Sequence, residues 1–169
     1  MLGAGVLDVN EIFRIVDQLE REHGGEPWHG SSLTAILRGV DHRLASSRPT
    51  PGAHTIWELV LHITAWKNEV RRRLGGEVAG EPADGDWPAV GEPSEPAWKA
   101  AIDRLQVAHR LLVSAVRDFP EAQLSVPTND HRSDGIAPAY YELILGVIQH
   151  DVYHSGQIAI LKKHLAPST

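Results

Sequence analysis

The sequence predicts an all-α protein, specifically an up-and-down four-helix bundle with long inter-helix loops. Apolar residues recur with the 3.6-residue period of helices along most of the chain, and no alternating strand pattern stands out. Clusters of glycine and proline divide these periodic segments into helices of bundle length. The chain has 169 residues, a length that suits one core, so residues 1–169 are predicted to form a single domain.

The first helix is predicted over residues 9–22, where Gly24 and Gly25 follow as a stop signal. Ser31 or Ser32 can cap a second, shorter segment with the sequence SLTAILRGVDHRLAS. We expect this segment either to extend the first helix or to cross one end of the bundle.

The next helix has the clearest start in the chain. Thr55 and Glu58 have the spacing of a capping box, and the helix is predicted to run over residues 55–74. Residues 75–96 are rich in glycine and proline, which predicts a loop or a partly mobile excursion.

Two helices are predicted in the remainder of the chain. The first covers residues 97–118 and is closed by Pro120. A second long loop is predicted over residues 125–136. The final helix is predicted to begin at Pro138, a favourable first-turn proline, and to continue to about Leu165.

Composition excludes several classes of function. The chain contains no cysteine, which rules out disulfides and cysteine-ligated metal and fits a cytoplasmic protein. Acidic residues outnumber basic ones by 22 to 16, so nucleic acid is not an expected partner. The basic triplet Arg71-Arg72-Arg73 falls in the last turn of a predicted helix, where cations favour the helix dipole. No apolar run reaches membrane-spanning length, and the first residues show no signal peptide.

Two histidines in the final helix occupy positions where the pattern calls for leucine. The inward seam of this helix is predicted to contain Leu143, Val147, His150, His154, Ile158, Leu161 and Leu165. His150 and His154 are one turn apart, so both imidazoles can point at one ion. The pair alone fits a metal site and packed or solvated histidines about equally well.

A third histidine favours the metal interpretation. His62 lies in the middle of the capped helix, on a face that also carries Leu59 and Trp66. Three imidazoles from two facing helices, with at least one coordination position left open, form the ligand set expected of a reactive metal site.

The segments that carry these histidines resemble a known family. GAHTIWELVLHITAWKNEVRRRL is similar to the second-helix motif of the DinB-like family of metal-binding four-helix bundles, and GVIQHDVYHSGQIAILKK is similar to its final-helix motif. PWHGSSL resembles the subgroup that includes the YfiT-type thiol transferases. The resemblance implies that His62, His150 and His154 bind Zn²⁺ or Ni²⁺, that water fills the remaining positions, and that the protein forms a homodimer.

Several other polar residues are candidate partners of the site. His29, in the loop WHG, is a candidate general acid or base, or else an anchor for its neighbour Trp28. Gln157 lies on nearly the same helix face as His150 and can orient a water or accept from the outer nitrogen of a ligand. Asp151 is predicted to form a cap or an inter-helix salt bridge. The remaining histidines are predicted to be solvated: His23, His42, His54, His109, His131 and His164.

Three functions are compatible with such a site. The favoured one is a metal-dependent transferase that joins a low-molecular-weight thiol to an electrophilic small molecule, because an open metal position lowers the pKa of a bound thiol. Metal-dependent hydrolysis is the alternative enzyme, and a non-catalytic metal-binding bundle is the alternative outside enzymology. Histidine also accepts Mn²⁺ and Fe²⁺, so the sequence leaves the metal open.

Overall fold

The computed structural model describes residues 10–49, 51–132, 135 and 137–165, and its regular secondary structure over these residues is helical. The elements are α1 (Glu11–Gly24), α2 (Leu33–Leu37), α3 (His42–Ser46), α4 (Ile56–Leu74), α5 (Glu95–Arg117), the 3₁₀ turn η1 (Glu121–Gln123) and α6 (Tyr140–Leu165). The predicted all-α class is confirmed. Position 9, at the start of the first predicted helix, and parts of the predicted loop 125–136 lie outside the described residues.

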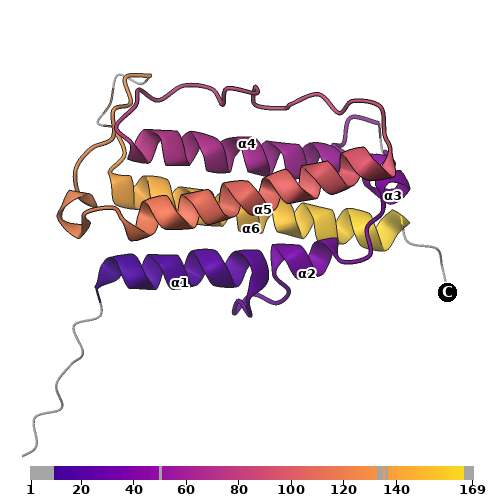
Figure 1. Ribbon diagram of the computed structural model, residues 1–169, viewed down its shortest axis with the longest axis horizontal. Coiled ribbons are helices and arrows are strands. Elements are labelled where there is room, and N and C mark those ends of the chain that lie inside the picture. Colours follow the sequence, from indigo (N-terminus) through magenta and orange to yellow (C-terminus); the bar gives the residue numbers. More distant parts are fainter. Residues whose placement is uncertain (1–9, 50, 133–134, 136, 166–169) are drawn as a thin grey trace, which may run out of the picture.

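The directions of the long helices differ from the predicted up-and-down order. Trp57 and Trp98 lie near the first residues of α4 and α5, and their ring centroids are 5.1 Å apart, so these two helices run parallel. Ile158, near the end of α6, packs in one cluster with Ile56 at the start of α4, so α6 runs antiparallel to α4. Residues 75–94 return along the whole length of the helices to allow this arrangement (Figure 1).

The length of that connection explains why the alternation fails. An extended segment of this size can span about 60 Å, whereas a helix as long as α4 spans about 30 Å. A short loop would force antiparallel neighbours, but a crossover of this length does not. The expectation of a simple up-and-down order was therefore wrong for α4 and α5.

The predicted second segment forms two short helices in place of one. α2 ends at Leu37, and the chain then passes through Gly39 with φ of 78°, a left-handed conformation that other residues rarely adopt. α3 restarts beyond it, because the Asp41 side chain accepts a hydrogen bond from the Leu44 amide. α1 and α2 lie end to end and together extend along α6 (Figure 1).

The ends of the long helices follow local signals in the sequence. The Thr55 side chain accepts from the Glu58 amide while the Glu58 carboxylate accepts from the Thr55 amide, which is the predicted capping box. The final helix begins at Tyr140, two residues after Pro138, so this proline precedes the first turn and does not occupy it.

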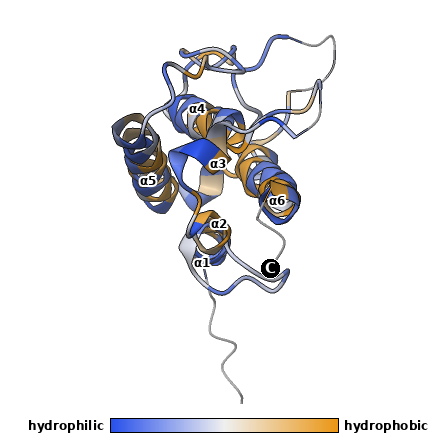
Figure 2. Cartoon of the chain, turned by 90° about the vertical axis from the view of Figure 1, so that its right-hand side faces the viewer, coloured by the Kyte–Doolittle hydropathy of each residue, from blue (hydrophilic) through white to orange (hydrophobic). Residues whose placement is uncertain are grey.

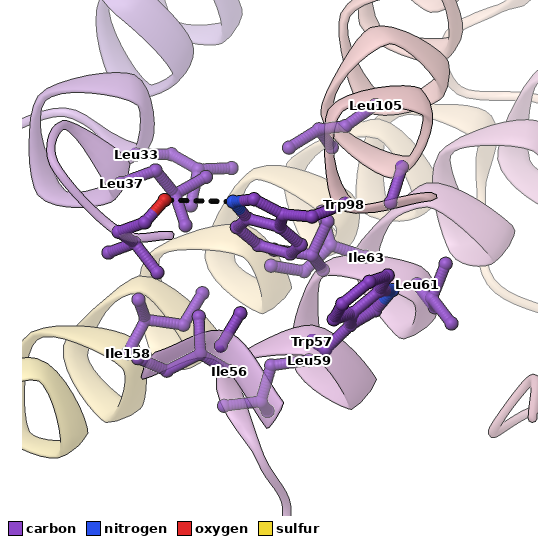
Figure 3. Close-up of a cluster of buried hydrophobic side chains, with 14 residues drawn as sticks. Leu33, Leu37, Ile56, Trp57, Leu59, Leu61, Ile63, Trp98, Leu105 and Ile158 are labelled. Carbon is purple, nitrogen blue, oxygen red and sulfur yellow. Dashed lines mark hydrogen bonds between the residues drawn. The ribbon is translucent and has the colours of Figure 1, made fainter. Parts of the chain in front are cut away.

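Two apolar clusters fill the interior, one toward each end of the helices. The first joins α2, α3 and the beginnings of α4 and α5 with Ile158 of α6, and it includes Trp98, whose indole N–H donates to the Val40 carbonyl oxygen at 2.8 Å (Figure 3). The second joins α1 with the last turns of α4 and α5 and the first turns of α6. Seen from the end, hydrophobic residues gather between the helices (Figure 2).

A layer of buried polar side chains lies between these two clusters. It consists of Glu22, His23, Lys67, His109, Asp151 and Ser155, contributed by α1, α4, α5 and α6. His23 and His109 were predicted to be solvated, and that prediction was wrong. They are buried and stack on each other with ring centroids 3.8 Å apart.

The crossover segment 75–94 is held against α4 by a buried carboxylate. Glu69 accepts hydrogen bonds from the guanidinium groups of Arg72 and Arg73 and from the amide of Gly80. The expected excursion is therefore attached along α4, and these arginines do more than balance the helix dipole.

Among the described residues, no helix combines the length and the apolar character that a membrane span requires.

Candidate metal centre

Three imidazoles meet between α4 and α6. His62 comes from the middle of α4, and His150 and His154 come from successive turns of α6. One nitrogen from each ring lies within 4.8 Å of the others, and the Nε2 atoms of His62 and His150 are 2.9 Å apart. Ring nitrogens separated by about this distance are spaced to share one ion, because metal–nitrogen bonds are about 2.0–2.1 Å long.

The outer nitrogens of two of these rings are fixed by oxygen acceptors. His62 Nδ1 donates to the backbone carbonyl oxygen of Asp86 at 2.6 Å, and His154 Nδ1 lies 2.8 Å from the Gln157 side-chain oxygen. A carbonyl oxygen can only accept, so the proton of His62 is on Nδ1 and its Nε2 lone pair is free. This is the tautomer that a metal ligand needs.

Electrostatics also keep these rings in the form that binds metal. Burial lowers the pKa of His62, although the hydrogen bond to Asp86 opposes this shift. Burial lowers the pKa of His154 to about 4, again against the effect of Gln157. Both imidazoles are therefore neutral near pH 7, and a neutral ring can bind a cation without first losing a proton.

His150 lies closer to solvent than predicted. The buried face of α6 is centred on Ile144, Val147, Asp151 and Ile158, and His150 lies at its edge. At this turn the buried face therefore lies one residue further along the helix than predicted. The position between the helices belongs to Asp151, whose predicted inter-helix salt bridge is confirmed by its contact with Lys67.

The three histidines line a pocket together with aromatic side chains. Trp87 stacks on the His62 ring at 3.9 Å, and His54 stacks on the Trp87 ring at 3.5 Å. The Trp66 indole N–H donates to an Asp86 carboxylate oxygen at 2.8 Å, which links the crossover segment to α4. The pocket has a volume of about 520 Å³ and is lined by His54, His62, Trp66, Asp86, Trp87, His150, Tyr153, His154 and Gln157.

The predicted site residues do not all come together. Gln157 contacts His154 directly, as one of its two predicted roles requires. His29 instead lines a separate cleft between the loop before α2 and α6, beside Ser155 and Lys162. The structure thus does not unite His29 with the three histidines.

Sequence reasoning missed the residues that the crossover contributes. Asp86 and Trp87 belong to a stretch that was predicted to be a loop. His54 is exposed, as predicted, and it also lines the pocket. The signal that was available is the tryptophan itself, since a large aromatic side chain in a polar, glycine-rich loop needs a surface to cover.

The structure is that of an all-helical protein with a cluster of three histidines compatible with binding a metal ion. The sequence profile of the DinB superfamily matches residues 28–158, a span that covers most of the chain and includes all three histidines. The chain belongs to the DinB superfamily. Neither the curated proteins nor the solved structures contain a match to it.

Proposed function

We propose that the protein is a metal-dependent transferase that joins a low-molecular-weight thiol to an electrophilic small molecule at a Zn²⁺ or Ni²⁺ centre. The observation that carries this proposal is the convergence of three imidazoles in the lining of an open pocket. Three protein ligands leave at least one coordination position for a substrate, whereas purely structural zinc sites are closed by four. This activity is that of the YfiT-type thiol transferases, the subgroup that the segment PWHGSSL resembles.

An ion held by His62, His150 and His154 would act as a Lewis acid and would lower the pKa of a bound thiol or water. The protein's own residues do the rest. Asp86 and Gln157 hold the His62 and His154 rings in the metal-binding tautomer. Trp87 covers one face of His62 and keeps water from that side. Because the chain contains no cysteine, the sulfur must arrive with a cosubstrate.

The reaction forms one carbon–sulfur bond. The thiol gives up its proton to water through the open side of the pocket, and its sulfur attacks the electrophilic carbon. The bond to the leaving group breaks, and the electron pair departs with that group. Trp66, Trp87 and Tyr153 offer apolar surface against which the electrophile can lie.

We propose two further properties, the first supported by the packing and the second by the resemblance. We interpret α1 and α2 together with α4, α5 and α6 as a four-helix bundle with one long crossover. We also infer that the protein forms homodimers, which light scattering during size-exclusion chromatography tests directly.

Metal analysis of untagged protein is the first test. We expect about one divalent ion per chain, and we expect His150→Ala to remove most of it. His164→Ala is the matched control, because His164 is an exposed histidine on the same helix. If the wild-type protein and His150→Ala contain equal amounts of metal, the site is wrong.

Transfer is tested with a panel of small thiols and monochlorobimane as the electrophile. The proposal predicts that the metal-loaded protein accelerates conjugation with at least one thiol and that the apo-protein does not. Hydrolysis of activated esters without thiol conjugation would instead support the metal-dependent hydrolase. Stoichiometric metal without either activity would support a non-catalytic metal-binding protein.

A further inference from the structure

The most unusual side chain in the core is Lys67. It lies in the middle of α4, its exposed fraction is 0%, and its ammonium group contacts the carboxylate of Asp151 on α6. Burying an ammonium and a carboxylate costs several kcal/mol per ion before their attraction offsets it, and apolar residues of similar size fill such a space at lower cost. Stability alone therefore does not explain why this ion pair is buried here.

Asp151 connects this pair to the metal centre. Its Oδ1 atom lies 3.6 Å from Nδ1 of His150, and its Oδ2 atom accepts from Lys67. Both Oδ1 of Asp151 and Nδ1 of His150 are buried and have no hydrogen-bond partner within the described part of the chain. A buried donor and a buried acceptor thus face each other slightly beyond bonding distance.

An ion would make these two atoms partners. When Nε2 of His150 binds a cation, the ring proton has to be on Nδ1, and Nδ1 becomes a donor. Asp151 Oδ1 lies next to it and can accept. A charge-assisted bond of this kind is about 2.7–2.9 Å long, so the two atoms have to approach by less than about 1 Å to form it.

We propose that Lys67 and Asp151 are positioning residues for the metal: Lys67 holds the Asp151 carboxylate, and that carboxylate holds the outer nitrogen of His150. This inference rests on the metal site of the proposed function but not on thiol transfer. It also distinguishes the three ligands. His62 and His154 have neutral oxygen acceptors, whereas the atom that faces Nδ1 of His150 belongs to an anionic carboxylate.

The first experiment measures metal affinity, by competition with a chromophoric chelator. Asp151→Asn removes the charge while conserving shape, and we expect it to weaken Zn²⁺ binding by about 10- to 100-fold. Glu22→Gln is the matched control, because Glu22 lies in the same buried layer but bonds Ser155, not a histidine of the site. Its affinity should stay within about threefold of wild type. Equal affinity in Asp151→Asn and wild type would overturn the inference.

Loss of stability has to be separated from loss of positioning. Asp151→Asn leaves the Lys67 ammonium unpaired, so the double variant Lys67→Met with Asp151→Leu is a second test that contains no unpaired charge. We expect it to fold and to bind Zn²⁺ as weakly as Asp151→Asn does. The Co²⁺-substituted protein should also change its visible absorption spectrum in both variants. Wild-type affinity and an unchanged spectrum in the double variant would overturn the proposal.

The wild-type protein provides a readout that needs no variant. In the Zn²⁺-loaded protein, nitrogen-correlated NMR of the imidazoles should show His150 protonated at Nδ1, with a proton that is shifted downfield and protected from solvent exchange. An unprotected or absent Nδ1 proton would refute the contact with Asp151. These measurements do not involve transfer, so an inactive protein that binds metal in this way would contradict the proposed reaction and leave the positioning role intact.

Discussion

The protein contains two clusters of histidines, and they differ in what surrounds them. His62, His150 and His154 turn one nitrogen each toward a common point beside an open pocket. His23 and His109 lie face to face between the two apolar clusters, with nearly parallel rings, and their buried Nδ1 atoms have no hydrogen-bond partner among the residues that the structure describes. The first arrangement directs lone pairs at a place that a ligand can reach, and the second does not.

The comparison shows that burial alone does not identify a functional histidine. Burial lowers the pKa of a histidine in the first cluster and of both histidines in the second: the pKa of His154 falls to about 4, as does that of His23, and the pKa of His109 falls to about 3. All of these rings are neutral near pH 7. What separates the clusters is the direction of the free nitrogens and the access of solvent to them, and Lys67 with Asp151 lies between the two.

The largest effect should come from breaking the buried pair. Lys67→Met leaves the Asp151 carboxylate without its partner in a dry environment, and we expect the free energy of unfolding to fall by about 3–5 kcal/mol. Urea denaturation followed by circular dichroism measures it. Lys67→Met combined with Asp151→Leu should recover most of the loss. If Lys67→Met has the same stability as wild type, Lys67 is not buried in the way the structure describes.

Much of the fold was readable from sequence because it depends on local signals. Thr55 and Glu58 determine the start of α4 by bonding to each other within four residues, and glycine and proline delimit the remaining helices. The parallel order of α4 and α5 was not readable, since residues 75–94 are long enough to permit either direction.

The metal centre and the polar layer also differ in how far each could be predicted from the sequence. His150 and His154 are one helical turn apart, so their common direction follows from a single helix. Lys67 and Asp151 come from different helices and are 84 positions apart in the sequence. Taken alone, each resembles the charged residue of an amphipathic helix, and only tertiary packing brings them together. His23 and His109 were misjudged for that reason.

The second prediction concerns acid. The pKa values of His23 and His109 are lowered chiefly by burial, with the charge of Lys67 adding to the effect. Below about pH 6.5 these two histidines therefore bind more protons in the unfolded chain than in the folded protein. The stability that the folded protein has above that pH is lost as the pH falls toward about 4. Between pH 6.5 and 4.5 the loss should be about 2–4 kcal/mol.

His109→Phe tests this prediction, because phenylalanine can still stack on His23 but does not titrate. We expect the midpoint of thermal unfolding to fall less in the variant than in the wild type between pH 6.5 and 4.5. The carboxylates titrate in both proteins, so the difference between the two slopes isolates the histidines. Parallel curves would show that the stacked pair does not carry the acid sensitivity.

An effect of opposite sign is expected from Glu22. Burial and the negative charge of Asp151 raise its pKa to about 8, so the folded protein favours the protonated carboxyl. The stability that this proton contributes is fully present below about pH 4.5 and is lost as the pH rises through about 8. Glu22→Gln should therefore be more stable than wild type at pH 8 by about 4 kcal/mol, and the gain should vanish at pH 4.5. Thermal melts at the two pH values decide this, and a gain of the same size at both would contradict it.

The smallest predicted effect belongs to the open cluster and concerns Gln157. Its side-chain oxygen is the acceptor for His154 Nδ1, and Gln157→Leu removes that acceptor while nearly conserving volume. The ring then turns more freely and its outer N–H loses a partner, so Zn²⁺ affinity should fall by about tenfold. Gln149→Leu is the control, since Gln149 is exposed on the same helix. A neutral acceptor holds its histidine less firmly than a carboxylate does, and the loss in Gln157→Leu should thus not exceed the loss in Asp151→Asn. A larger loss at Gln157 would reverse that ranking and would make His154, not His150, the ligand whose support determines the affinity of the site.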